Sequence, residues 1–474
     1  MPATKNIDRA LSWPIISTLF QFSIPIFLGS LLQSAYQIID AYWVGKLWAD
    51  AVAAVSVSFP ITFFMISVWA GFATAGSIFV AQYAGKKDFS MVNHVTAQTM
   101  LLVVVLAIIL GAIGFFLSPT LLHLMNVDDA VFAWALSFLQ ITFLGLMFTF
   151  WFSMFQSLMR WVGEVRLPLY IIFGSVCLNF IFDPLFINGW GIIPGLWVAG
   201  AALATLVTQF LASVVASWVL LSGKFGIHVG FRDFVPDFSY IRRAFLLGFP
   251  SSVEMSTRSL SMVVMTFLIT SFGTIAIASY GAGSNIVQLI MIPAMALSMA
   301  TSTLVWQNIG ARNMNRASEI ARVSSWISFL LFTGIGVFVY FTASMLISFF
   351  IPEDQQVIDG WAALLQTIAP FFGFLGLQMA ITGTFRASGN MTTPLILTLV
   401  SSWVIQFPVA YIFAYHTDMG IQGVWYSFVI NYVLTAIITI AIFHKGDWKK
   451  KKITEEENDS RDAYQEATLG ERVQ

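Results

Sequence analysis

Charged residues are scarce in this 474-residue chain, where Asp, Glu, Lys and Arg together make up 10% of the sequence. A soluble domain contains about 25% of such residues. In contrast, 58% of the chain is hydrophobic and its mean hydropathy is +0.81. Long apolar runs predict a polytopic helical membrane protein. The net charge of −1 gives no general attraction to nucleic acid.

Cysteine is almost absent as well. Cys177 is the single one, which excludes an intramolecular disulfide and a cysteine-based metal site. The sequence also lacks a glycine-rich phosphate-binding loop and an HExxH zinc motif, and its five histidines are scattered. We therefore predict no enzyme activity and no cofactor. Any transport would depend on an ion gradient rather than on ATP.

Twelve apolar segments of membrane-spanning length lie between charge clusters and chain-breaking residues. A helix rises about 1.5 Å per residue, so about 20 residues cross a hydrocarbon core of about 30 Å. The segments cover residues 14–46, 51–84, 91–118, 130–158, 166–187, 195–222, 240–271, 275–309, 317–350, 357–386, 392–415 and 419–443. The predicted fold class is an all-α polytopic membrane protein with 12 transmembrane helices.

Basic residues collect in the loops after even-numbered segments, whereas the alternate loops are mainly acidic, with Lys46 as an exception. The basic set comprises Lys86, Lys87, Arg160, Arg166, Lys224, Arg232, Arg242, Arg243, Arg312, Arg316, Arg322 and Arg386. By the positive-inside rule, both termini should be cytoplasmic. We predict a multi-pass protein of the cell (cytoplasmic) membrane.

The chain repeats itself at an offset of 225 or 226 residues. The matching landmarks are Pro25 with Pro250, Gln82-x-x-Gly85 with Gln307-x-x-Gly310, and Arg160-x-x-Gly163 with Arg386-x-x-Gly389. Six segments separate the copies, so both have the same orientation. We predict two six-helix bundles related by a pseudo-two-fold axis along the membrane normal, as in some secondary transporters.

Five regions follow from the repeat and the charge pattern. They are a cytoplasmic N-terminus at 1–13, an N-terminal six-helix lobe at 14–222, a cytoplasmic linker at 223–239, a C-terminal six-helix lobe at 240–444 and a charged cytoplasmic tail at 445–474. The tail has too few apolar residues to fold alone.

Asp40 is the one acid in the first apolar segment. A charge at mid-membrane depth costs at least about 2.5–3.5 kcal/mol, so such a residue usually faces a cavity, a partner or an ion. Gln33 and Gln37 share its helical face, and Pro25 permits a bend below it. The alternative is that Asp40 lies close enough to the outer surface to be solvated.

The fifth segment contains Asn179 and Asp183 at a spacing of four, which puts their oxygens on one helical face. Together with Asp40, these oxygens suit a hard cation such as Na⁺, or a proton shared between two close carboxylates. Asp183 could instead mark a helix end before Pro184. In the sixth segment, Thr205 could equally donate to a carbonyl of its own helix.

Polar and sulfur-containing residues in the seventh and eighth segments form a second candidate set. Glu254 and Arg258 are four residues apart, in the favourable order for an ion pair. They either form a structural pair or line a pocket that senses the charge of a substrate. Gln33, Gln37, Met262, Asn285 and Gln288 complete the candidate substrate cleft. Flexible thioethers such as that of Met262 adapt to varied ligands, although packing alone could also explain the methionines of this region.

The twelve segments, the repeat and several motifs resemble the multidrug and toxic compound extrusion (MATE) transporters. The motifs are Pro25 and Asp40 in helix 1, Gln82-x-x-Gly85 after helix 2, Asn179-x-x-x-Asp183-Pro184 in helix 5 and Ala199-Gly-Ala-Ala-Leu-Ala-Thr205 in helix 6. The resemblance covers residues 10–445. It implies two lobes around a V-shaped cleft, and export of organic, often cationic, amphipathic compounds in exchange for Na⁺ or H⁺.

The resemblance also implies a coupling site. In the DinF-like branch this site lies in the N-terminal lobe, and it corresponds here to Asp40, Asn179, Asp183 and Thr205, with Na⁺ possible as the bound metal and Pro25 as hinge. Other branches use an acid in helix 10, which is absent between Leu364 and Thr384. The expected partners are amphipathic drugs or organic cations and the lipid bilayer, with no nucleic acid, and the expected state is a monomer.

Two other function classes compete with this interpretation. A lipid or lipid-linked oligosaccharide flippase of the same superfamily would need several basic residues inside its helices, and Arg258 is the one clear example in the sequence. A membrane-embedded enzyme would need a catalytic cluster facing one leaflet, which the sequence does not show. A receptor or scaffold would have no reason to bury Asp40 and Asp183.

Overall fold

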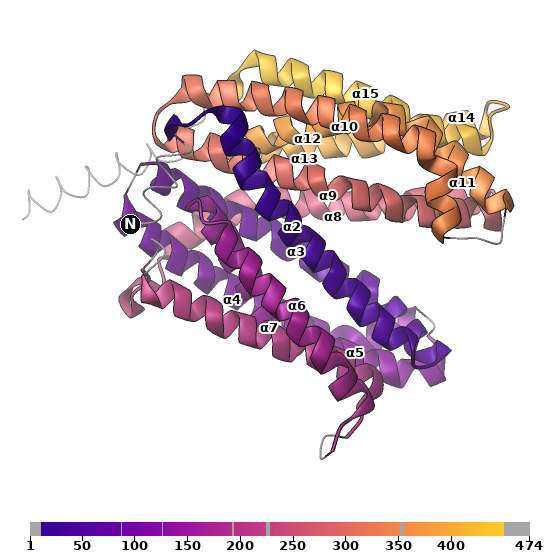
Figure 1. Ribbon diagram of the computed structural model, residues 1–474, viewed down its shortest axis with the longest axis horizontal. Helices are drawn as coiled ribbons and strands as arrows, with labels where there is room; N and C mark the ends of the chain where they lie inside the picture. Colours follow the sequence, from indigo (N-terminus) through magenta and orange to yellow (C-terminus); the bar gives the residue numbers. More distant parts are fainter. Residues whose placement is uncertain are drawn as a thin grey trace, which may run out of the picture.

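The computed structural model of the protein describes residues 11–86, 88–125, 127–191, 194–223, 228–350 and 355–449, so most of the charged tail and the first ten residues lie outside it. These residues are mainly helical (Figure 1). The helices are α2 (Ile15–Gly45), α3 (Ala49–Gly85), α4 (Phe89–Leu124), α5 (Asp129–Trp161), α6 (Arg166–Asn188), α7 (Trp197–Ser222), α8 (Phe238–Thr270), α9 (Thr274–Gly310), α10 (Met314–Phe350), α11 (Gln355–Ile368), α12 (Phe372–Ala387), α13 (Thr392–Leu399), α14 (Phe407–Tyr415) and α15 (Ile421–Lys445).

The twelve predicted segments each correspond to one helix or one interrupted helix. The tenth is broken by a 3₁₀ turn, η2 (Ala369–Phe371), because Pro370 has no N–H to donate. The eleventh contains a π-helical stretch, η3 (Val400–Gln406), just before Pro408. Among the described residues, eleven helices are long and apolar enough to cross a membrane. The seventh segment, α8, falls short of that criterion, since it contains Arg242, Arg243, Glu254 and Arg258.

The first six helices pack mainly on one another, and so do the last eight, except that α8 packs more on α3 than on any helix of its own half. In the first half α5 contacts α3, α4 and α7, while α6 contacts α2 and α7. In the second half α10 contacts α9, α11 and α12, while α15 contacts α12 and α14. The halves meet where α3 lies on α8 and α9, and α2 on α9. Figure 1 shows the two groups of helices close together near the start of α2 and farther apart near its end.

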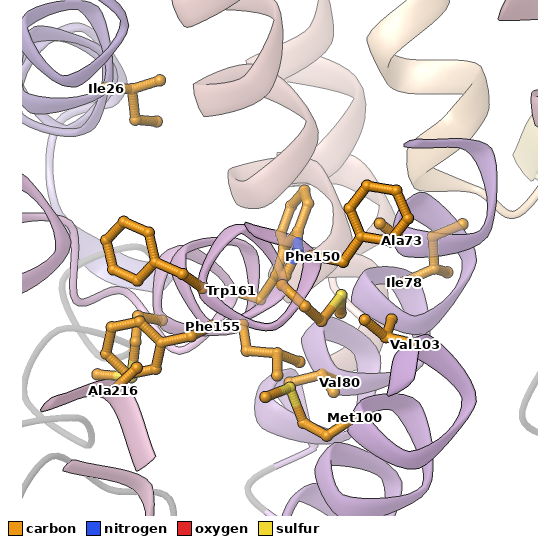
Figure 2. Packing of buried hydrophobic residues seen from close by; sticks show 14 of the residues in the cluster. Ile26, Ala73, Ile78, Val80, Met100, Val103, Phe150, Phe155, Trp161 and Ala216 are labelled. Atoms are coloured by element: carbon orange, nitrogen blue, oxygen red, sulfur yellow. The ribbon is translucent and has the colours of Figure 1, made fainter. Parts of the chain in front are cut away.

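The apolar core of the first half lies around α5. Figure 2 labels Phe150 and Trp161 of α5, Ala73 and Ile78 of α3 and Val103 of α4, which all belong to one cluster of buried apolar residues. All five are buried. Small residues on α3 let the neighbouring helices approach closely, as is usual between membrane helices. This packing fixes the direction of α5 and therefore the position of the residues at its end.

The halves are held together at one end by residues of the repeated motifs, and we call this the closed end. Trp161 and Trp306 have ring centroids 3.9 Å apart, and the Gln307 side chain donates to the Trp161 carbonyl at 2.7 Å. Gly310 lies directly on the backbone of Gln82. The two copies of the Gln-x-x-Gly motif therefore pack against each other across the halves.

The segment that joins the halves is bound to α4 at the same end. Gln98 is fully buried, and its amide donates to the carbonyls of Asp233 and Val235 at 2.7 and 2.6 Å. Its carbonyl accepts the Asp237 N–H at 2.9 Å. The predicted linker is thus partly a packed element, including the 3₁₀ turn η1 (Phe231–Phe234), while residues 224–227 lie outside the described part.

Gly310→Ala should loosen the closed end. A methyl group at Gly310 would lie 2.3 Å from the Gln82 carbonyl oxygen, so α3 and α9 must separate. Overpacking of this kind costs about 1–3 kcal/mol. We expect a lower midpoint of thermal unfolding for the purified protein. Gly334→Ala is the matched control, because its methyl group would meet nothing within 4 Å. Equal midpoints for the two variants would contradict the described contact.

Candidate cation-binding site

Side chains from α2, α6 and α7 converge on one buried polar group. The Thr205 hydroxyl donates to Asp40 Oδ2 at 3.2 Å, which joins α7 to α2. Within α6, Asn179 Nδ2 donates to Asp183 Oδ1 at 3.1 Å. The Asp40 carboxyl group also lies close enough to Asp183 and Asn179 to interact with them electrostatically. The four residues suggested by the sequence are therefore brought together.

Several oxygens in this group have no partner among the described residues. They are Asp40 Oδ1, Asn179 Oδ1, Asp183 Oδ2 and the Ser175 hydroxyl, all buried. Asn179 and Asp183 are fully buried as whole residues. Buried polar atoms in proteins are nearly always paired, so an unpaired cluster needs an explanation. Two carboxylates with amide and hydroxyl oxygens fit either a hard cation or a bound proton.

The geometry also decides between the local alternatives left by the sequence. Asp40 is partly exposed as a whole residue, but its Oδ1 is shielded from solvent, so this oxygen faces the protein interior rather than water. Helix α6 continues past Pro184 to Asn188, so Asp183 does not terminate it. Thr205 donates to Asp40 and thus across helices. All three side chains are oriented toward the same interior space between α2, α6 and α7.

One residue next to this group was missing from the predicted set. Tyr36 is buried and hydrogen-bonded to Thr208, one turn from the contact between Asp40 and Thr205. Its position four residues before Asp40 could have revealed it. Gln33 and Gln37, which were predicted to share a helical face with Asp40, are instead exposed, and no described contact places them in the cluster.

Glu254 is the centre of a second buried polar group, in the other half. It is 1% exposed, and its Oε1 lies 2.6 Å from Arg386 and 3.7 Å from Arg258. Thr398 also donates to this oxygen, at 3.4 Å. Arg386 was predicted both as the last residue of the tenth segment and as part of the basic loop after it. The structure places it in the last turn of α12, with its guanidinium against Glu254. The distance from Arg386 to Glu254 is therefore shorter than the distance from Arg258 to Glu254, the pair that the sequence predicted.

The remaining predicted cleft residues are not gathered around a common point. Met262 and Gln288 are exposed, and the side chain of Asn285 lies outside the described part. Pro25 lies inside the continuous helix α2. The structure thus assembles the Asp40 group closely, whereas it leaves the candidate substrate cleft as a prediction.

A third feature is a cavity of about 110 Å³ between the halves. Residues of α3, α5, α9 and α12 line it, including Arg160, Trp161, Trp306 and Arg386. Arg258 remains the one clear base in the middle of a helix, but Arg160 and Arg386, which were counted with the basic loops, line this cavity from the last turns of α5 and α12. Single-sequence reading could not tell whether a basic residue at a helix end turns inward or toward water.

Comparison with known proteins identifies the class. The MatE family model matches residues 25–185 and, a second time, residues 250–412. The chain therefore belongs to the MatE family of membrane transporters, which is not a family of enzymes. The two matches begin 225 residues apart, as the repeated landmarks do.

Individual relatives agree with this assignment over nearly the whole chain. "Probable multidrug resistance protein YpnP" of Bacillus subtilis (strain 168) is 30% identical over 442 residues, covering 93% of this chain and 97% of the relative. "Probable multidrug resistance protein YoeA" of the same organism is 27% identical over 439 residues, covering 91% and 94%. A solved structure described as "Crystal structure of MATE in the bent conformation" matches the fold with a TM-score of 0.87 at 22% identity, covering 94% of this chain and 98% of that chain.

Proposed function

We propose that this transporter is a multidrug antiporter, which exports organic, often cationic, amphipathic compounds in exchange for Na⁺ or H⁺ by alternating access. The names of the relatives support drug efflux. The observation that supports ion coupling is the buried group of Asp40, Asn179, Asp183 and Thr205, with its unpaired oxygens. No resident cofactor takes part, since the coupling ion is itself cargo.

The location of this group favours the DinF-like branch of the family. It lies entirely in the first half, while the stretch from Leu364 to Thr384 in the second half contains no acid. The double match of the family model supports two lobes related by a pseudo-two-fold axis along the membrane normal. We place the protein as a monomer in the cell membrane with both termini in the cytoplasm, so the closed end faces the cytoplasm.

The proposed cycle depends on competition between ion and substrate. A cation or proton at Asp40 and Asp183 removes the repulsion between the two carboxylates and draws α2 toward α6. Pro25 lacks an N–H, so α2 can bend there at low cost. The new position of α2 weakens drug binding, and the drug leaves from the end opposite the closed end. Because coupling is reciprocal, the drug must weaken ion binding by the same factor.

Separate ion gradients test this function. In proteoliposomes loaded with a fluorescent organic cation, an imposed Na⁺ gradient at equal pH and an imposed pH gradient at equal Na⁺ should be compared. We expect one of them to accelerate efflux several-fold over vesicles with no gradient, because only the coupled ion adds driving force. Efflux that responds to neither gradient would contradict the antiport proposal. Liposomes loaded in the same way but without the protein provide the control for leakage.

The flippase remains the second candidate function. The observation that favours it is the basic cavity at the closed end, where Arg160 and Arg386 lie inside the helix bundle. Phosphate groups of a lipid-linked substrate would be attracted to such a cavity. The transport of a fluorescent phospholipid between leaflets, measured in the same vesicles, separates the two candidates.

A further inference from the structure

The cavity at the closed end has features of a binding site that the cation-coupling proposal does not use. Its volume of about 110 Å³ is that occupied by about three or four water molecules in liquid water. It lies between α3 and α5 of one half and α9 and α12 of the other, with Arg160 and Arg386 from opposite halves on its wall. It is therefore large enough for a small polar group, and both halves contribute to it.

The charge around the cavity is unbalanced. Arg160 is partly exposed, and within the described chain its guanidinium has no ion pair and no hydrogen bond. Arg386 shares the single carboxylate of Glu254 with Arg258. The nearest acid to Arg160 in the sequence, Glu164, is engaged with the backbone N–H groups of Arg166 and Leu167. Two guanidinium groups thus share one carboxylate, while Arg160, on the same cavity wall as Arg386, has no carboxylate partner among the described residues.

The hydroxyl groups on the wall carry no charge that could balance the arginines, and they cannot donate to a ligand because their protons are already donated. Ser298 donates to the Met379 carbonyl at 2.8 Å and Ser302 to the Gly383 carbonyl at 2.9 Å. Ser77 donates to the carbonyl of Ala73 at 2.6 Å. The free donors are therefore those of the two arginines. Guanidinium groups form paired hydrogen bonds with carboxylate or phosphate oxygens, and they repel organic cations.

The internal repeat gives independent support. Arg160 and Arg386 occupy equivalent positions 226 residues apart, and Ser77 and Ser302 are equivalent at 225. Both pairs line the same cavity. The cavity therefore lies between the two copies of the repeat. A ligand that bridges its arginines holds α5 and α12 together, so its binding favours the conformation in which this end is closed.

We propose that this cavity is an oxyanion-binding site, with Arg160 as its main ligand and Arg386 as the second. The ligand is a carboxylate or phosphate group, provided either by a dissolved amphipathic compound or by a phospholipid headgroup. The site is separate from the Asp40 group in the first half. Its test uses binding alone, so its failure does not depend on the outcome of the gradient experiment.

The experiment measures binding of radiolabelled inorganic phosphate to the purified full-length protein in a non-ionic detergent. Phosphatidylglycerol and phosphatidylcholine are added separately as competitors, and each lipid's direct binding is also measured. Variants Arg160→Gln and Arg160→Lys test the main ligand. Arg166→Gln is the control, since this arginine is exposed at the start of α6 near the same end. Thermal unfolding of every variant checks that it folds.

We expect saturable binding of phosphate or phosphatidylglycerol to the wild type and to Arg166→Gln. Arg160→Gln should weaken it at least about tenfold, the effect of losing one pair of charge-assisted hydrogen bonds. Arg160→Lys should be intermediate, because an ammonium group cannot form the paired contact, and it decides the test if Arg160→Gln does not fold. Binding of phosphate identifies a dissolved anion, and binding of phosphatidylglycerol alone identifies a headgroup. No saturable binding to the wild type, or equal affinities for the Arg160 and Arg166 variants, overturns the proposal.

Discussion

Asp183→Asn should abolish gradient-driven transport in proteoliposomes while leaving the protein folded. The substitution keeps the shape of the side chain and its place beside Asn179, 3.1 Å away, but it removes one of the two charges available to a bound cation or proton. Loss of a charged ligand costs more than about 1.4 kcal/mol, so coupled efflux should fall at least about tenfold. Asp40→Asn should have the same effect, since Asp40 and Asp183 are close to each other.

The double variant shows whether the two carboxylates act as a unit. When two residues act together in one function, replacing either of them already abolishes it. The double variant Asp40→Asn with Asp183→Asn should therefore lose no more coupled efflux than either single variant. Asp50→Asn is the matched control, because Asp50 is an exposed acid in the first turn of α3. Normal coupling in either single variant would exclude that carboxylate from the ion site. Efflux losses that multiply in the double variant would show that the two act independently.

The Asp40 group could be predicted because its chemistry is rare in a membrane. An acid inside an apolar segment is costly, and the spacing of Asn179 and Asp183 puts both on one face. The sequence could not show how far each helix is rotated toward its neighbours. Gln37 and Tyr36 illustrate this: both are within one turn of Asp40, yet Tyr36 is buried beside Thr208 and Gln37 is exposed. A helical face only becomes an interior face when a neighbouring helix covers it.

The helical segments and their repeat were predictable for a similar reason, since spanning length and local landmarks are properties of the chain itself. Contacts between the halves are not. Arg386 is the last residue of its predicted segment, and the sequence does not show whether it belongs to the helix or to the basic loop that follows. Its contact with Glu254 joins residues that are 132 positions apart. The same limit hid the basic cavity, because Arg160 and Arg386 line one cavity only after both halves have folded and packed.

Glu254→Gln should be the most destabilising single substitution of an acid in the second half. Glu254 is 1% exposed and its Oε1 receives Arg386 at 2.6 Å, Arg258 at 3.7 Å and the Thr398 hydroxyl at 3.4 Å. Removing its charge leaves the guanidinium groups of Arg386 and Arg258 without a carboxylate. Arg386 also lines the cavity on whose wall Arg160 lies. Breaking a buried pair costs about 3–5 kcal/mol, and we expect the lower end because Arg386 remains 27% exposed.

Denaturant or thermal unfolding of the purified protein measures this loss, with Glu319→Gln, an exposed acid on α10, as the control. The partner is tested by Glu254→Gln combined with Arg386→Gln, which should recover part of the stability because it removes a charge of each sign. Recovery would show that the pair acts mainly to join α8 to α12. If Glu254→Gln unfolds like Glu319→Gln but changes which drug cations are exported, Glu254 is instead a residue that senses substrate charge.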